Sequence, residues 1–168
     1  MGPGIAIKAV SGQYFSVLVF GFAQVAMDIE PLIRIMRGDS VLHGFTHTYV
    51  GATFVAFAAL FLGRPCCQLW LRAWNLITAP RYLRWLQASH VISRPAAITG
   101  AFVGTYSHVF LDSIMHSDMQ PWSPFTTGNS LLQAIPTGWL HLLCIGLGVV
   151  GAMALLVIFV WNKFAIEI

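Results

Sequence analysis

The sequence predicts an all-α, polytopic membrane protein: a bundle of four transmembrane helices with one helical segment in the headgroup layer. Two observations predict this fold class. Of the 168 residues, 57% are hydrophobic and 9% are charged, and the mean hydropathy is +0.74. A soluble domain carries roughly 25% charged residues, so this chain lacks the charge to cover a water-facing surface. Four apolar stretches also have the length of about 20 residues that a helix needs to cross a bilayer.

The four expected spans belong to one membrane domain that covers residues 1–168. They lie at about residues 9–27, 41–62, 96–115 and 136–161. The first ends in the polar run Asp28-Ile-Glu-Pro31, and the second ends at Gly63-Arg-Pro65, because charge and proline favour a helix stop. The third carries Asp112 near its end, and the fourth stays apolar up to Trp161.

Residues 66–94 differ from the spans. Trp70, Trp74 and Ile77 recur at helical spacing, while four arginines and Pro80 interrupt any spanning run. Aromatic and arginine side chains without acids are typical of helices that lie in the headgroup layer. A charged loop over the bundle is the alternative.

The basic residues indicate how the bundle is oriented. With four spans, both termini and the 64–94 segment share one face, which holds seven basic residues: Lys8, Arg64, Arg72, Arg81, Arg84, Arg94 and Lys163. The other face holds Arg34 and Arg37. The positive-inside rule then puts both termini in the cytoplasm, in the inner membrane. Because this rule accounts for the net charge of +3, we expect no nucleic-acid partner.

Ionisable side chains gather at the outward ends of the spans. Five of the six acids and five of the six histidines lie there: Asp28, Glu30, Asp39, Asp112, Asp118, His43, His47, His108, His116 and His141. Such groups at membrane depth are expensive and usually functional. We expect Asp39 to cap the second span and His90, on the opposite face, to be an interfacial histidine. His141 is either a ligand or a hydrogen-bonded histidine.

Two spacings predict a metal site among these residues. His43 and His47 form an HxxxH pattern at the start of the second span, and an i, i+4 pair puts both imidazoles on one helix face. His108, Asp112 and His116 repeat the same step in the third span. A hydrogen-bonded histidine is the alternative for either pattern alone. An aspartate in an apolar helix, however, needs a cation or a donor nearby, so the two patterns together predict a metal centre.

The donor types indicate the metal. Asp28 joins the nitrogen and carboxylate candidates, and the three cysteines form no metal-binding pattern. Such ligands favour Zn²⁺, with Mn²⁺, Fe²⁺ or Ni²⁺ as alternatives. The donors exceed the four of a structural zinc site, which favours two ions or one ion with an open position. Ser107 and Thr46 neighbour ligands and are candidate hydrogen-bond partners for them, although packing is the favoured role for Thr46.

The same residues carry a family resemblance. The strings are Asp28-Ile-Glu-Pro31, His43-Gly-Phe-Thr-His47-Thr48, Ser107-His-Val-Phe-Leu-Asp112 and Trp122-Ser-Pro-Phe125. In this order, over about residues 20–125, they resemble the YdjM-type membrane-bound metal-dependent hydrolases. The resemblance implies Asp28, His47, His108 and Asp112 as metal ligands. The leading histidine of the family falls on Leu42, one position before His43, and the resemblance implies no particular substrate.

We therefore expect metal-dependent hydrolysis of a lipid-borne or membrane-proximal ester, above all a phosphoester, at the outer face. Asp28, Glu30 and Asp118 are the candidate catalytic carboxylates. Arg34 and Arg37 are candidate phosphate contacts, with solvated loop charges as the alternative. A metal-ion transporter and a non-catalytic, metal-stabilised scaffold are the alternative functions. The expected partners are the bilayer and a lipid substrate, and a homo-oligomer is left open.

Overall fold

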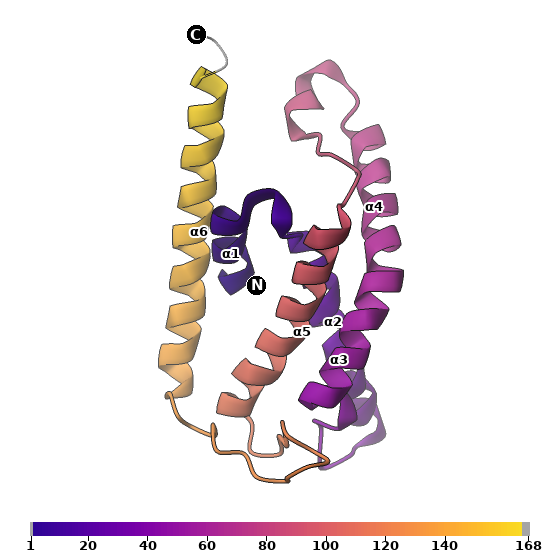
Figure 1. Cartoon of the computed structure of the whole chain (residues 1–168), viewed down its shortest axis with the longest axis vertical. Helices are drawn as coiled ribbons and strands as arrows, with labels where there is room; N and C mark the ends of the chain where they lie inside the picture. Colours follow the sequence, from indigo (N-terminus) through magenta and orange to yellow (C-terminus); the bar gives the residue numbers. More distant parts are fainter. Residues whose placement is uncertain (1, 166–168) are drawn as a thin grey trace.

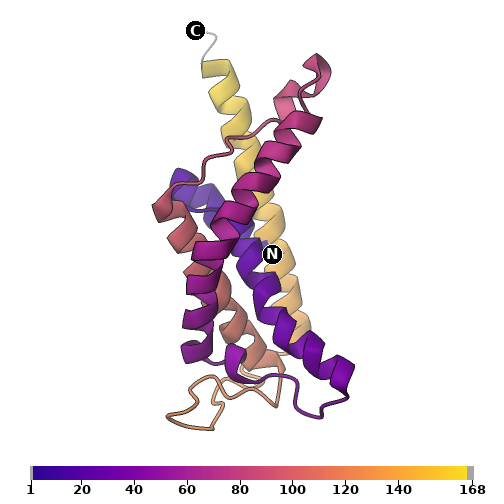
Figure 2. The ribbon, with the colours of Figure 1, turned by 90° about the vertical axis from the view of Figure 1, so that its right-hand side faces the viewer.

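The computed structural model describes residues 2–165, and this part of the chain contains helices and loops but no strand (Figures 1 and 2). The predicted all-α class is therefore confirmed. In chain order the elements are α1 Gly2–Ser11, η1 Gly12–Tyr14, α2 Val17–Arg37, η2 Phe45–His47, α3 Tyr49–Ala58, η3 Ala59–Gly63, α4 Arg64–Ile77, η4 Arg81–Leu86, α5 Arg94–Met115 and α6 Thr137–Ala165. The short elements η1, η2 and η4 are 3₁₀ turns, and η3 is a π turn.

The first predicted span, residues 9–27, is interrupted in the structure. Gly12 adopts a left-handed backbone conformation, with φ at 51°, that glycine tolerates because it has no Cβ. The helix α2 begins after Ser16, whose hydroxyl oxygen accepts a hydrogen bond of 3.3 Å from the Val19 amide. Ser16 thus satisfies one of the amides that a helix start leaves free.

The helix α2 also continues through the polar run at residues 28–31, where the sequence predicted a stop. The polar side chains lie on the helix surface, where Glu30 and Arg34, one turn apart, form an ion pair of 2.8 Å, and Pro31 lies inside the helix. The helix ends at Gly38, whose positive φ of 76° closes its last turn. Asp28 consequently projects from a helix, one turn after Gln24.

The second predicted span, residues 41–62, begins and ends later than expected. The helix α3 begins only after Thr48, whose hydroxyl oxygen accepts a 2.9 Å hydrogen bond from the Gly51 amide. It then passes the predicted stop at Gly63-Arg-Pro65 through η3, in which the Arg64 amide donates to the Ala59 carbonyl five residues earlier. Pro65, which has no backbone N–H to donate, directly follows this π turn, so the continuous helix changes its hydrogen-bond pattern next to the proline. The first part of the predicted interfacial segment 66–94 is thus a continuation of α3.

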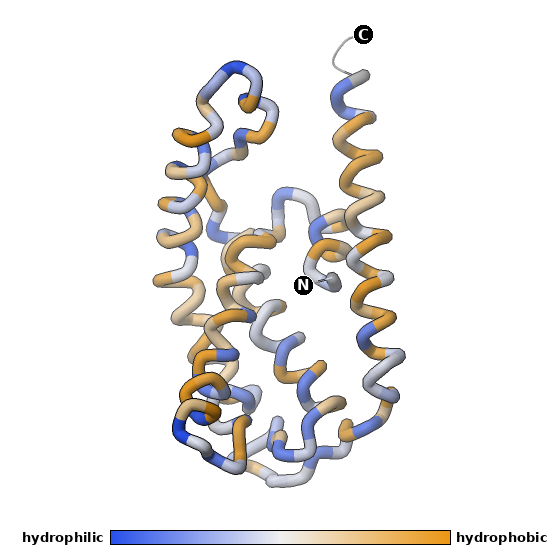
Figure 3. Tube along the Cα trace, turned by 180° about the vertical axis from the view of Figure 1, so that it is seen from behind, coloured by the Kyte–Doolittle hydropathy of each residue, from blue (hydrophilic) through white to orange (hydrophobic). Residues whose placement is uncertain are grey.

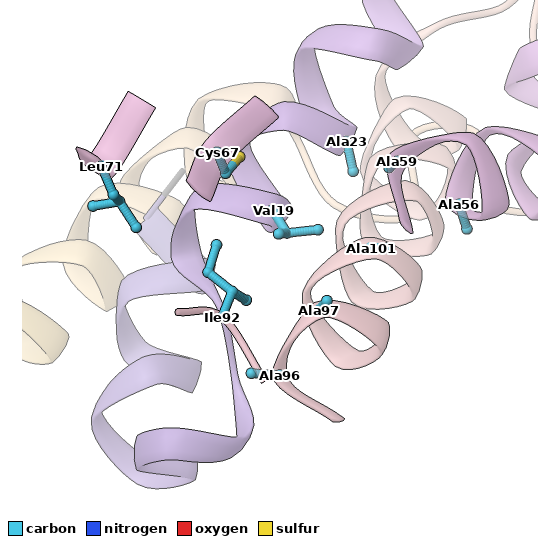
Figure 4. Packing of buried hydrophobic residues seen from close by; sticks show 10 residues of the cluster. All are labelled: Val19, Ala23, Ala56, Ala59, Cys67, Leu71, Ile92, Ala96, Ala97 and Ala101. Atoms are coloured by element: carbon cyan, nitrogen blue, oxygen red, sulfur yellow. The ribbon is translucent and has the colours of Figure 1, made fainter. Parts of the chain in front are cut away.

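The third and fourth expected spans, residues 96–115 and 136–161, correspond to α5 and α6 within a few residues. Small residues let α2 and α5 approach closely. A Cβ added to Gly104 of α5 would lie 2.9 Å from the Cβ of Ala23 of α2. Alanines dominate the buried cluster around this contact, as Figure 4 shows, and small residues at helix contacts are typical of membrane bundles. This contact brings Gln24 beside α5.

The helix α6 packs on α1 and leaves most of its apolar side chains exposed (Figures 1 and 3). Two helical stretches of the described chain are long and apolar enough to cross a membrane: Tyr49–Ile77, made of α3, η3 and α4, and Thr137–Lys163 of α6. The sequence predicted four spans. The crossing of the membrane by α2 and α5 stays a prediction.

Candidate metal centre

Seven histidine and aspartate side chains from three parts of the chain meet near the C-terminal end of α5, which is the lower end of that helix in Figure 1. They are Asp28 of α2, His43 and His47 from the segment before α3, His108 and Asp112 of α5, and His116 and Asp118 just after α5. The segment before α3 and the loop after α5 are tied together where the Tyr49 amide donates a 2.9 Å hydrogen bond to the Pro121 carbonyl. All the metal ligands predicted from the sequence are therefore neighbours in space.

Asp112 lies at the centre of this cluster. Its Oδ2 is 3.1 Å from Nε2 of His108, 3.6 Å from Nε2 of His47 and 3.9 Å from Nε2 of His43. On the outer side, Oδ1 of Asp28 is 3.3 Å from Nε2 of His108. Three imidazoles thus present the same ring nitrogen to one carboxylate.

The orientation of His108 follows from its contact with Gln24. The Gln24 amide nitrogen donates to the Gly104 carbonyl at 2.7 Å, so the amide oxygen is the atom that faces Nδ1 of His108, at 3.0 Å. An amide oxygen only accepts hydrogen bonds. The proton of neutral His108 therefore lies on Nδ1, and Nε2 carries a lone pair directed toward the cluster.

The same logic fixes the ring of His47. The Thr46 hydroxyl has a single proton, which it donates to Glu30 Oε2 at 2.5 Å, so toward Nδ1 of His47, at 3.1 Å, it acts as the acceptor. Glu30 also accepts from the Thr46 amide at 2.8 Å. Neutral His47 is then protonated on Nδ1 and free on Nε2. The carboxylate–hydroxyl–imidazole chain resembles the outer contacts that orient histidine ligands in metal sites.

His43 is held by Asp118. Its Nδ1 donates to Asp118 Oδ1 at 2.8 Å, while Asp118 Oδ2 accepts from the backbone amides of Leu42 and His43 at 2.8 Å and 3.1 Å. Partial burial raises the pKa of Asp118, but the hydrogen bonds from His43 and Leu42 outweigh it and lower that pKa to about 2. A permanent carboxylate thus holds His43 with Nε2 toward Asp112.

In the neutral tautomers described above, two buried ring nitrogens find no hydrogen-bond donor among residues 2–165. They are Nε2 of His47 and Nε2 of His108, and the two residues are only 1% and 8% exposed. Leaving a buried polar atom unpaired costs about 1–3 kcal/mol. A cation that accepts both lone pairs removes this cost, and the adjoining carboxylates of Asp28 and Asp112 offset its charge.

The spacing of the donors fits a transition metal. Four ligands at about 2.0–2.1 Å around a tetrahedral ion lie about 3.3 Å from one another. The contacts of His108 with Asp112 and Asp28, and of His47 with Asp112, are 3.1, 3.3 and 3.6 Å. These three contacts have the spacing of neighbouring ligands on one ion, and the donor atoms of Asp28, His47 and His108 lie within 4.8 Å of one another.

No protein-family model, curated protein or solved structure matches this chain. The resemblance to the YdjM-type hydrolases stays a prediction, and the geometry above is what supports the site.

Several residues expected at the site lie around it rather than in it. Glu30 is occupied by Thr46 and by Arg34, whose Nε and Nη2 both donate to its Oε1. Arg34 is therefore paired inside the chain, whereas Arg37 is exposed. His116 is exposed, with its ring 4.4 Å from that of His43.

The two remaining histidines are apart from the cluster. His141 of α6 uses Nδ1 to contact the Thr137 carbonyl of its own helix at 2.8 Å, which is the hydrogen-bonded alternative that the sequence left open. His90 is exposed in the loop before α5. Both lie outside the sets of side chains that could share an ion in the described part of the chain.

Sequence reasoning missed Gln24 and assigned Thr46 to packing. Gln24 stands four residues before Asp28, on the same helix face, and is an amide within an apolar run. That spacing was a usable signal. The role of Thr46 had no such signal, because its partner Glu30 is 16 residues away in the sequence.

Proposed function

We propose that this protein is a membrane-embedded, metal-dependent hydrolase that cleaves a phosphoester of a lipid or of another membrane-proximal substrate. One observation carries the proposal: the buried, unpartnered Nε2 atoms of His47 and His108 converge with carboxylate oxygens of Asp28 and Asp112. Histidine and aspartate without thiolate suit Zn²⁺, or Mn²⁺, Fe²⁺ or Ni²⁺.

The four side chains differ in exposure, and this difference supports catalysis over a closed structural site. His47, His108 and Asp112 are at least 87% buried by side chain, whereas 65% of the Asp28 side chain is exposed. The cluster is therefore open to solvent on the Asp28 side. A divalent ion held by His47, His108 and Asp112 would keep a fourth position for water on the Asp28 side, and it would activate that water as a nucleophile at neutral pH. Asp28, the carboxylate at the opening, is the candidate proton acceptor.

Two of the three expected catalytic carboxylates receive another role in this proposal. Glu30 holds Thr46 against His47, and Asp118 holds His43, so both act as positioning residues. Their existing hydrogen bonds leave them poorly placed to accept a proton from substrate water. This reassigns the expected catalytic function of Glu30 and Asp118 to Asp28 alone.

The place of the cluster supports a substrate at the membrane surface. Most of its members lie near the end of α5 or in the two loops beside that end, although Asp28 lies midway along α2. Figure 2 shows these loops together at one end of the bundle. A headgroup ester lies at that depth when α3, α4 and α6 cross a bilayer. With four spans and the positive-inside rule, this end faces outward from an inner membrane.

The test starts with metal content. The detergent-purified chain should hold about one or two transition-metal ions, and the His47→Ala/His108→Ala double variant should lose them. The matched control is His141→Ala, which removes a histidine outside the cluster. Stoichiometric metal in the double variant would rule out the site.

Activity is measured on vesicles of phosphatidylethanolamine and phosphatidylglycerol, by release of water-soluble phosphate compounds with and without a chelator. Chelator-sensitive release that is lost in His108→Ala and kept in His141→Ala supports the hydrolase. If the metal-bound protein releases no water-soluble phosphate compound, the hydrolase proposal is contradicted for these lipids. In the same vesicles, metal flux without hydrolysis indicates a transporter. The absence of both metal flux and hydrolysis indicates a scaffold.

A further inference from the structure

A groove of about 640 Å³ runs between α2 and the α3–η3 helix. Apolar side chains line most of its length: Phe22, Ala26 and Ile29 on α2, and Val55, Ala58 and Leu62 on the facing helix. Ile29 and Leu62 are 52% and 63% exposed. Its size falls in the range of about 300–1,000 Å³ that is typical of small-molecule sites, and its exposed apolar walls call for an apolar occupant.

One end of this groove is polar. Glu30 and Arg34 line it but neutralise each other in their 2.8 Å ion pair. Arg37 and Asp39 also line it and are exposed. Among the described residues, neither Arg37 nor Asp39 makes a side-chain ion pair. The groove therefore ends in one free positive charge and one free negative charge.

We infer that this groove binds one zwitterionic phospholipid, with an acyl chain along the apolar walls, its phosphate at Arg37 and its ammonium group at Asp39. Arginine suits a phosphate because its planar guanidinium donates several hydrogen bonds, and a carboxylate complements an ammonium group. A singly anionic headgroup such as phosphatidylglycerol would leave Asp39 uncompensated. The charge pair at the end of the groove thus favours phosphatidylethanolamine.

Thr46 stands between the groove and the metal centre. Thr46 lines the polar end and also holds Nδ1 of His47, so the headgroup would lie at the same end of the bundle as the metal ligands. The inference rests on the proposed function only where it identifies the bound lipid as the substrate. Binding itself is measured without turnover.

The experiment is native mass spectrometry of the full chain after exchange into detergent with equimolar phosphatidylethanolamine and phosphatidylglycerol. We expect one phosphatidylethanolamine retained per chain. Ala58→Trp fills the groove from an exposed position and should lower retention about tenfold. Ala152→Trp, at an exposed position of α6, is the matched control and should retain the lipid.

A second variant tests the headgroup contacts. Arg37→Gln/Asp39→Asn changes two exposed side chains, so folding is not at risk, and it should abolish the preference for phosphatidylethanolamine. Equal retention by Ala58→Trp and the wild type, or a wild-type preference for phosphatidylglycerol, overturns the inference. Selective lipid retention without hydrolysis supports the lipid site and contradicts the hydrolase proposal. Hydrolysis without selective lipid retention supports the hydrolase proposal and contradicts the lipid site.

Discussion

Replacing Gln24 by methionine tests how the metal centre is oriented. The substitution keeps the length of the side chain but removes the oxygen that faces Nδ1 of His108 at 3.0 Å and the nitrogen that donates to the Gly104 carbonyl. His108 then loses the contact that keeps its proton on Nδ1, and the imidazole can rotate or change tautomer. Loss of such an outer contact typically costs 10–100-fold in metal affinity, which is about 1.4–2.7 kcal/mol.

The assay is a competition titration of Zn²⁺ between the detergent-purified protein and a chromophoric chelator. Gln68→Met is the matched control, because Gln68 lies on α4, away from the cluster. We expect a weaker dissociation constant for Gln24→Met, an unchanged one for Gln68→Met and no stoichiometric binding for His108→Ala. An unchanged dissociation constant in Gln24→Met, alongside lost binding in His108→Ala, would refute the tautomer argument while leaving the site itself intact.

Three further predictions follow from the same contacts. Because the pKa of Asp118 is about 2 in the folded chain and about 3.9 in an unfolded one, its carboxylate stabilises the fold above about pH 4. In metal-free protein, Asp118→Asn should lower the free energy of unfolding by about 1 kcal/mol at pH 7, after a discount for solvent screening. If the difference in unfolding free energy between this variant and the wild type does not shrink between pH 4 and pH 2, the prediction is contradicted. Gly104→Val overpacks the contact between α2 and α5, so it should lower the unfolding free energy by about 1–3 kcal/mol and weaken Zn²⁺ binding. Gly146→Val adds atoms in open space and should do neither. Chemical denaturation in detergent measures the unfolding free energy of both variants. Adding Zn²⁺ at 100 times its dissociation constant should raise the unfolding free energy by about 2.7 kcal/mol relative to chelated protein, and an equal value would mean that the native state binds no ion at these residues.

Much of the fold could be predicted because it depends on local composition. The apolar runs that become α5 and α6 are visible in the sequence, and their bounds agree with the structure within a few residues. Helix ends at polar residues were less predictable. Asp28–Pro31 and Gly63–Pro65 both contain helix-breaking signals, but α2 continues through the first, with Glu30 and Arg34 paired on its surface, and the π turn η3 carries the helix past the second. Such compensation involves residues whose effect is not evident from local propensity.

The ligand pairs illustrate the same division. His108 and Asp112 lie one turn apart on α5, so their proximity follows from the helical repeat and was predictable. His43 and His47 have the same spacing but lie in a loop and a 3₁₀ turn. Their rings are still 4.8 Å apart, because Asp118 and Thr46 hold them from outside and not because they share a helix face.

The sequence by itself determined the all-α class, the scarcity of charge and the gathering of histidines and aspartates near the same helix ends, because each depends on residue type and on short, regular spacing. Only the tertiary structure decided which atoms of those residues face one another. Gln24 reaches His108 across 84 residues and Asp118 reaches His43 across 75. The orientation of an imidazole is set by hydrogen bonds over such distances, and these exist only once the helices have packed.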